Sequence, residues 1–250
     1  MTNTYFDFED GNGPVPAHKH PNGGGWVADT AEVANTAYVG TYARVFGNAR
    51  VYGDARVYHD AKVFGHAKVS GDAKVSEDAH VSGNAEVCGV ARVSEDAHVS
   101  GNAEVYDNAH VSGNAEVYDN AKVSGNARVF GNAKVYDNAK VYGNARVYDN
   151  SRVNGRTLVF GDAEVSNNVR RDNPDTKQQT SEKSKGDKSY NYKLEYTYIN
   201  SNTGTWSKEE TKTHYCANME TALKIMDKAF SNYCPNITVS RFEMEDEEVE

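Results

Sequence analysis

The sequence predicts a mainly β protein, in which a regular coil of short strands is followed by a small α+β domain. Two observations lead to this prediction. Valine stands at every sixth position from Val27 to Val165, which gives 24 valines without one insertion. A small residue, nearly always alanine, follows four residues after each valine, and Gly, Asn and Asp are frequent between them. Such a short, sustained period sets the fold of the whole segment.

Each six-residue unit, such as NAKVYD at residues 132–137, combines one short strand with one bend. Ala and Val are two residues apart, so they point to the same side of a strand, and the residues flanking Val point outward. Gly, Asn and Asp tolerate the backbone dihedrals of tight bends. An α-helix is excluded because a period of six does not match 3.6 residues per turn. The repeat therefore predicts a coil with Ala and Val inside.

Over residues 26–170 this repeat resembles that of the hexapeptide-repeat family, whose members form a left-handed parallel β-helix of triangular section with eighteen residues per coil. The resemblance implies about eight coils, stacked about 4.8 Å apart. The left-handed sense comes from the family, because ordinary parallel crossovers are right-handed. Family members also suggest a homotrimer. The lead-in VPAHKHPNGGGWVADTA is similar to that of uncharacterised hexapeptide-repeat proteins of bacteria and their phages.

The composition changes on both sides of the repeat. Residues 1–25 are rich in Gly and Pro, and we expect them to cap the open first coil. Residues 171–189 hold many charges and almost nothing apolar, which is typical of a linker. Residues 190–244 predict a ββαβ head domain, and residues 245–250 form an acidic tail.

The head is predicted from a change of periodicity. Residues 190–199 and 205–215 alternate apolar and polar side chains and predict a β-hairpin. Residues 218–233 carry a helical apolar stripe, and residues 236–244 supply a third strand. Two aromatic residues of the hairpin are candidates for binding a protein partner: Trp206 and Tyr215.

The net charge of −9 lies mostly outside the repeat, since residues 26–170 contain 15 basic and 18 acidic residues. This nearly neutral, mixed surface argues against a DNA mimic and against nucleic acid as a partner. There is no apolar run of membrane-spanning length and no secretory leader, so we expect a soluble protein. Three cysteines without metal-ligand spacing agree with the cytoplasm, which is the host cytoplasm for a phage protein, and a virion is the alternative location.

Several hexapeptide-repeat relatives are acyltransferases, and some are zinc carbonic anhydrases. As a family, these enzymes work at clefts between the prisms of a trimer, with a histidine and often a loop that interrupts the coils. No loop interrupts the valine repeat from Val27 to Val165, so the usual wall of an acyl-donor pocket is missing. We therefore expect no catalytic residue and no cofactor, and we keep an enzyme with its site at the prism interface as an alternative.

Residues eighteen apart lie above one another on the same face of such a coil. One outward column contains His80, His98 and Glu116, which are ligand types that zinc accepts. The stretch SEDAHVSGNAEV also occurs twice, at residues 76–87 and 94–105, so a duplication places one histidine over the other without any metal. The column is a candidate metal site with a competing structural explanation.

A second outward column places a basic or titratable side chain before valine in six successive coils, and such a ladder could bind a polyanion. Acids at the neighbouring corners, such as Asp60, Glu77 and Glu95, favour a ladder of solvated salt bridges instead and would repel nucleic acid. The ladder consists of Arg56, Lys74, Arg92, His110, Arg128 and Arg146.

Aromatic residues follow valine near both ends of the repeat, including Phe46 and Phe64, whereas serine takes this position in the middle coils. Stacking of aromatic side chains along a face stabilises a sheet and explains much of this pattern. Aromatic clusters also favour contacts between prisms or with a partner. The candidate interface residues are Tyr118, Tyr136, Tyr142, Tyr148, Phe130 and Phe160.

Taken together, these features favour a non-catalytic, oligomeric binding protein. We expect a rod, a homotrimer as in the family, that presents the C-terminal head for recognition of another protein. A phage protein of this kind would be a virion component or an inhibitor of a host defence protein. The alternatives are a hexapeptide-repeat enzyme and polyanion binding along the basic ladder.

Overall fold

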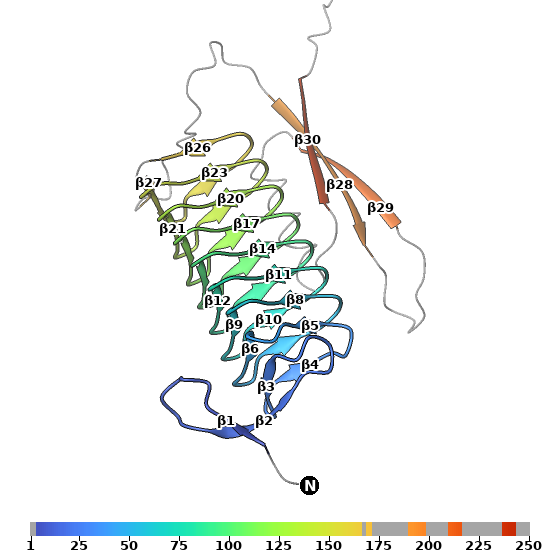
Figure 1. The fold of residues 1–250 in the computed structure, drawn as a ribbon. Coiled ribbons are helices and arrows are strands. Elements are labelled where there is room, and N and C mark those ends of the chain that lie inside the picture. Colours follow the sequence, from blue (N-terminus) through green and yellow to red (C-terminus); the bar gives the residue numbers. More distant parts are fainter. Residues whose placement is uncertain (1–3, 167–168, 172–189, 199–209, 217–236, 244–250) are drawn as a thin grey trace, which may run out of the picture. The chain divides into compact units, whose positions relative to one another are not determined.

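The computed structural model describes residues 4–166, 169–171, 190–198, 210–216 and 237–243, with side chains described for residues 4–166. The chain divides into two compact units, Met1–Ser181 and Glu182–Glu250. The first unit is a parallel β-solenoid of about eight turns, which confirms the predicted coil (Figure 1).

Three parallel sheets form the sides of the solenoid, and we call them faces 1, 2 and 3. Face 1 is an eleven-stranded sheet that also includes the two N-terminal strands. Its strands are β1 (Tyr5–Phe6), β2 (Val15–Lys19), β3 (Trp26–Ala28), β6 (Arg44–Val45), β9 (Lys62–Val63), β12 (His80–Val81), β15 (His98–Val99), β18 (Glu116–Val117), β21 (Lys134–Val135), β24 (Arg152–Gly155) and β27 (Val169–Arg171).

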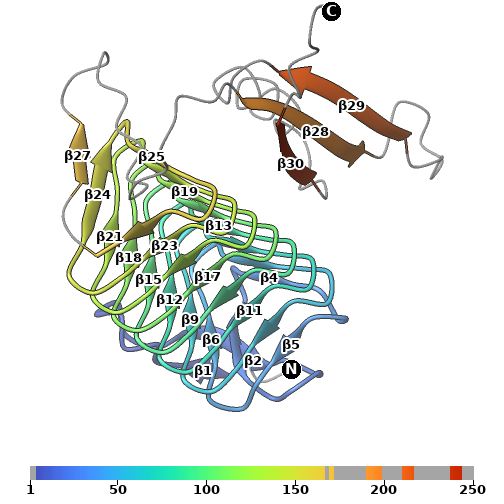
Figure 2. The same cartoon turned by 90° about the horizontal axis from the view of Figure 1, so that it is seen from above.

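Faces 2 and 3 have eight strands each, and the rows can be followed along the solenoid in Figure 2. Face 2 consists of β4 (Glu32–Val33), β7 (Arg50–Val51), β10 (Lys68–Val69), β13 (Glu86–Val87), β16 (Glu104–Val105), β19 (Lys122–Val123), β22 (Lys140–Val141) and β25 (Leu158–Val159). Face 3 consists of β5 (Tyr38–Val39), β8 (Arg56–Val57), β11 (Lys74–Val75), β14 (Arg92–Val93), β17 (His110–Val111), β20 (Arg128–Val129), β23 (Arg146–Val147) and β26 (Glu164–Val165).

Hydrogen bonds between successive coils hold the register. Val63 pairs with Val45 and with Val81, so residues eighteen apart lie directly above one another. The backbone N–H of Phe64 donates to the carbonyl oxygen of Val81 at 2.9 Å, and the same pattern continues along the faces. A strand only two residues long is stable here because both of its neighbours satisfy its backbone groups.

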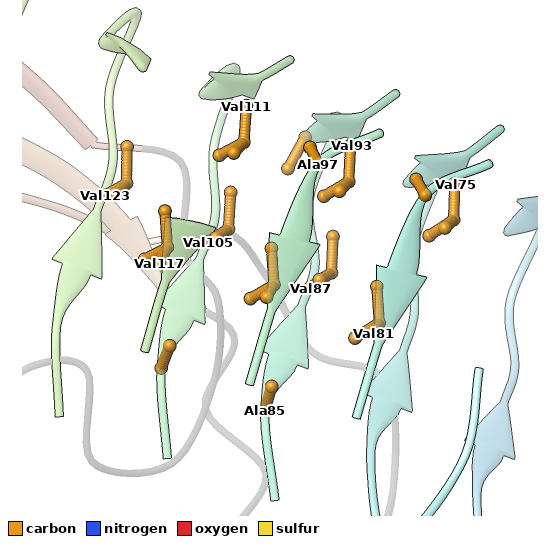
Figure 3. Close-up of a cluster of buried hydrophobic side chains, with 14 of the residues drawn as sticks. Val75, Val81, Ala85, Val87, Val93, Ala97, Val105, Val111, Val117 and Val123 are labelled. Atoms are coloured by element: carbon orange, nitrogen blue, oxygen red, sulfur yellow. The ribbon is translucent and has the colours of Figure 1, made fainter. Parts of the chain in front are cut away.

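The interior is built almost entirely from valine and alanine. From Ala37 to Val147 these inward side chains have no exposed surface, whichever face they come from. Figure 3 shows Val75, Val81 and Val87, from three successive faces, turned toward a common interior. Small β-branched and methyl side chains are needed because three sheets converge on one narrow axis.

The bends adopt the left-handed backbone region that the Gly, Asn and Asp pattern predicts. From Val45 to Val159 the second residue after each repeat valine has a positive φ, as in Gly101 (φ 67°) and Asp119 (φ 58°). The coils also approach closely there, since a Cβ added to Gly101 would lie 2.7 Å from the backbone nitrogen of Asp119. Glycine is therefore favoured at a corner such as Gly101 for two separate reasons, although other corners, such as Asp119, carry a side chain.

The N-terminal segment packs on the first coils. β1 and β2 form an antiparallel pair, and β2 pairs antiparallel with β3. Phe6 stacks on Trp26 with ring centroids 4.4 Å apart, and Phe8 stacks on Phe46 at 4.9 Å. Arg44 Nη1 lies 2.7 Å from the carboxylate of Glu9. This segment therefore covers the outward aromatic residues of face 1 in the first coils.

In the second unit the structure describes three strands, β28 (Tyr190–Tyr198), β29 (Glu210–Cys216) and β30 (Ile237–Glu243). β28 pairs antiparallel with both others, so β29 and β30 are the edge strands. The predicted helix over residues 218–233 lies outside the described residues, and the ββαβ head stays a prediction. No helix in the described part of the chain has the length and apolar character needed to cross a membrane.

Replacement of Gly101 by Ala should destabilise the solenoid more than the same change at Gly161. Both glycines have a similar positive φ, of 67° and 65°, so both variants carry a conformational cost of about 1–2 kcal/mol. Only at Gly101 does the new Cβ meet the next coil, whereas nothing lies within 4 Å of a Cβ at Gly161. We expect crowding to add about 1–3 kcal/mol at Gly101. Urea unfolding measures both values, and equal losses of stability would contradict close coil approach as a constraint.

Candidate functional site

The outward residues before valine form one column on each face, and the three columns differ in how their charges pair. On face 2, acids and bases form pairs between successive coils. Glu32 and Arg50 lie 3.2 Å apart, and Glu104 and Lys122 lie 3.0 Å apart. The lysine of a third pair, Lys68, has its pKa raised by the hydrogen bond to Glu86. Face 2 is therefore a set of local ion pairs between successive coils.

The column on face 3 is the predicted basic ladder, and the structure places all six of its residues in register. Arg146 binds Glu164 at 3.1 Å. Within residues 4–166, no carboxylate lies within 4.0 Å of the charged nitrogens of Arg56, Lys74, Arg92 or Arg128. The expected salt bridges to the corner acids are therefore not formed among these residues.

The corner acids bind backbone groups instead. The Glu77 carboxylate accepts a hydrogen bond from the Glu95 N–H at 2.7 Å. Asp107 Oδ2 accepts one from the Gly125 N–H at 3.2 Å. The Glu77 and Asp107 carboxylates thus bind N–H groups of the next coil and not the cations of the ladder.

His110 stands in the middle of the ladder. Burial lowers the pKa of its imidazole, and the positive charges of Arg92 and Arg128 lower it further, while Glu95 acts in the opposite direction. A neutral imidazole is therefore favoured between two arginines, which limits the repulsion inside the column.

The candidate metal column lies on face 1. The rings of His80 and His98 meet edge to face with centroids 4.7 Å apart, and burial and the neighbouring His98 lower the pKa of His80. Glu116, the third candidate ligand, binds Lys134 Nζ at 2.6 Å. No group of three or more metal-ligating side chains is arranged to hold an ion within the described residues. The metal site stays a prediction.

The six candidate interface aromatics stack in pairs, one pair on each face. Tyr118 and Tyr136 lie nearly parallel at 4.9 Å on face 1, and each is half-buried. The other two pairs are Phe130 with Tyr148, at 5.2 Å on face 3, and Tyr142 with Phe160, at 5.5 Å on face 2. Aromatic side chains thus surround the C-terminal coils.

The aromatic residues at the opposite end have a different role. Phe46 is 6% exposed because Phe8 covers it, and Phe46 in turn stacks on Phe64 at 5.0 Å. The N-terminal aromatics of face 1 therefore pack within the chain, whereas Tyr52 on face 2 is exposed. Of the two candidate residues in the head, Trp206 lies outside the described residues, and Tyr215 lies on β29, where only the backbone is described.

Two features of the corners were missed in the sequence. Asparagine side chains form hydrogen-bonded ladders, such as Asn84 to Asn102 to Asn120, with both bonds at 3.1 Å. The recurrence of asparagine at eighteen-residue spacing was the available signal. The second feature is Asp107, whose burial raises the pKa from 3.8 to about 6, although its hydrogen bond from Gly125 opposes this shift.

Replacement of Asp107 by Asn should stabilise the solenoid at neutral pH. Because the folded-state pKa is raised, the folded protein binds the proton more tightly, and the stability contributed by Asp107 is lost as the pH rises from about 4 to about 6. The variant lacks this loss, so we expect a gain of roughly 1–3 kcal/mol at pH 7. Urea unfolding at several pH values measures it.

Asp137→Asn is the matched control, because Asp137 has the same positive φ and accepts a hydrogen bond from the Gly155 N–H at 3.0 Å. A gain of equal size in this control would contradict burial of Asp107 as the cause.

Comparison with known families gives one match. A model of the YdcK beta-solenoid repeat matches residues 43–59, 49–65, 121–137 and 139–155. The matched segments lie within the solenoid and are consistent with a repeat β-helix family. No curated protein matches the chain.

Proposed function

We propose that the chain is a hexapeptide-repeat protein with a left-handed β-helix, which acts as a non-catalytic scaffold. In this proposal it assembles as a homotrimer and presents its C-terminal head to a protein partner. A bacterial or phage origin and a cytoplasmic location belong to the same proposal, with a virion component or an inhibitor of a host defence protein as the two phage roles.

One observation carries the proposal. From β3 to β26 the solenoid continues without an inserted loop, and its outward side chains bind their own counterparts in the next coil. Examples are the ion pair of Glu104 with Lys122 at 3.0 Å and the hydrogen bond of Asn102 with Asn120 at 3.1 Å. Residues used in this way build a stiff support, and catalysis would require a general base with an orienting partner in a cleft.

The aromatic pairs support self-association of this rod. They lie on all three faces at the same end, and the middle coils carry serine at the same position, as in Ser82 and Ser100. Aromatic residues are enriched in the cores of protein interfaces. A trimer of parallel rods would bring these bands to the same height.

Support for the head as the recognition element comes from its sheet. β29 and β30 are edge strands among the strands described for this unit. An edge strand offers unpaired backbone groups, and adding a partner strand to such an edge is a common mode of recognition.

Sedimentation equilibrium tests the oligomer. We expect a mass three times the 27.4 kDa of one chain. Replacing both aromatics of one pair by serine, as in Tyr118→Ser with Tyr136→Ser, copies the middle coils and should preserve the solenoid while lowering the mass for at least one face. Tyr52→Ser, at an exposed aromatic on face 2, is the control. A monomer in the wild type, or a trimer in all three double variants, would contradict the proposed interface.

Affinity capture from host lysate tests the head. The full-length protein should retain one partner, and the double variant Trp206→Ala with Tyr215→Ala should lose it. Tyr42→Ala with Tyr52→Ala removes two exposed aromatics of the solenoid and should retain the partner.

Loss of the partner from the solenoid variant alone would place recognition on the rod. Zinc bound at one ion per chain and lost on His80→Ala, or saturable binding of acyl-coenzyme A, would instead favour the enzyme alternative.

A further inference from the structure

The ladder on face 3 differs from the other two columns because it holds only basic or titratable residues over six successive coils, from Arg56 to Arg146. Arg92 is the register partner of His110, His110 of Arg128, and Arg128 of Arg146. Like charges directly opposite each other on neighbouring strands destabilise a sheet. Face 2 also has like charges in register, in Arg50 with Lys68, Glu86 with Glu104 and Lys122 with Lys140. Its acids and bases nevertheless pair with each other, whereas no acid stands in the face 3 column from Arg56 to Arg146. Folding alone does not require this arrangement.

The cations of the ladder are accessible to an anion. Arg92 and Arg128 are exposed, and within residues 4–166 no carboxylate neutralises them. The corner residues beside Arg128 are Gly125, Asn126, Gly131 and Asn132, which carry no charge. The acids nearest in sequence to Arg92 are Glu95 and Asp96, and the Glu95 backbone is already held by Glu77. Positive charge is therefore least offset around Arg128, whereas Asp60, Glu77, Asp78, Glu95 and Asp96 stand at the corners that follow Arg56, Lys74 and Arg92.

The geometry of the ladder favours a straight, extended chain as its ligand. Successive rungs lie about 4.8 Å apart, the spacing of neighbouring strands. Phosphates of duplex DNA follow one another at about 3.4 Å per strand and wind around an axis, so only a few would meet a straight column. A flexible single chain with one charge per unit can place a charge at each rung.

The side chains beside the ladder distinguish between kinds of single chain. On the same face, the residues after valine in the middle coils are Ser76, which is buried, and Ser94 and Ser112, which are partly exposed. Tyr58, Phe130 and Tyr148 hold this position at other rungs. Single-stranded nucleic acid is bound largely by stacking of its bases on aromatic side chains, which the middle coils do not offer. Serine hydroxyls donate and accept hydrogen bonds and suit the hydroxyl groups of a sugar. Arginine binds a carboxylate with two parallel hydrogen bonds.

We infer that face 3 binds a linear acidic polysaccharide with one carboxylate on each sugar, along the ladder from Arg56 to Arg146. Arg92 and Arg128 bind carboxylates of the polymer. His110 between them, with Arg92, Arg128 and Glu95 as its charged neighbours, donates an N–H to a sugar hydroxyl while it is neutral. Ser94 and Ser112, the partly exposed serines beside the ladder, bind further hydroxyl groups. This site does not depend on the proposed function of the head.

Fluorescence anisotropy of the full-length protein with a labelled oligogalacturonate tests the inference. We expect saturable binding at low salt that weakens as salt is added. The double variant Arg92→Gln with Arg128→Gln should weaken binding by about tenfold or more, since it removes two charge pairs. Because it also relieves repulsion inside the ladder, its thermal stability should not fall. Arg92→Lys with Arg128→Lys keeps the charge but loses the paired hydrogen bonds, and should weaken binding less.

Arg50→Gln with Lys122→Gln is the matched control, since it removes the same charge from face 2. Its affinity should stay within about twofold of the wild type. A neutral oligosaccharide of the same length should not bind. The inference is overturned if the wild type does not bind oligogalacturonate at low salt, or if the control pair weakens binding as much as the ladder pair. Tighter binding of oligo-dT than of oligogalacturonate would identify nucleic acid as the ligand and would overturn it too.

Discussion

The structure depends on one constraint, the stacking of each residue on its counterpart eighteen positions later. The backbone hydrogen bonds between coils enforce this register, as between the Phe64 N–H and the Val81 carbonyl at 2.9 Å. Once it holds, every side chain has a copy or an analogue about 4.8 Å above and below it. The inside of the coil then has room only for Val and Ala, and the corners only for residues that accept a positive φ.

The same constraint makes the outer surface a set of columns whose composition is free. A column is stabilised when neighbouring members attract, as the ion pairs of face 2, the asparagine ladders and the aromatic pairs do. A column of one sign is destabilised. The columns that reinforce one another explain the stiffness of the solenoid, and the positive column of face 3 is the one that folding does not explain.

The sequence was sufficient to predict a coil of short strands with a Val and Ala core, because these follow from the six-residue period, and the resemblance to the hexapeptide-repeat family implied the eighteen-residue register. The sequence could not predict which groups the charged side chains at the corners bind. Glu77 and Asp107 have the position and charge of partners for the ladder, yet each binds a backbone N–H of the next coil. The burial of Phe46 was equally hidden, because Phe8, which stacks on it, lies in the N-terminal segment outside the repeat. Contacts made by segments outside a repeat leave no periodic signal.

Hydrogen–deuterium exchange of backbone amides along residues 44–148 tests the central claim most directly. If every coil is bonded to the next without interruption, the N–H groups that donate across coils should be protected uniformly, at the corners as well as in the strands. A coil-length stretch of rapid exchange inside this range would contradict the account. It would show that a segment leaves the stack, which is the kind of interruption that an active site in such a rod requires.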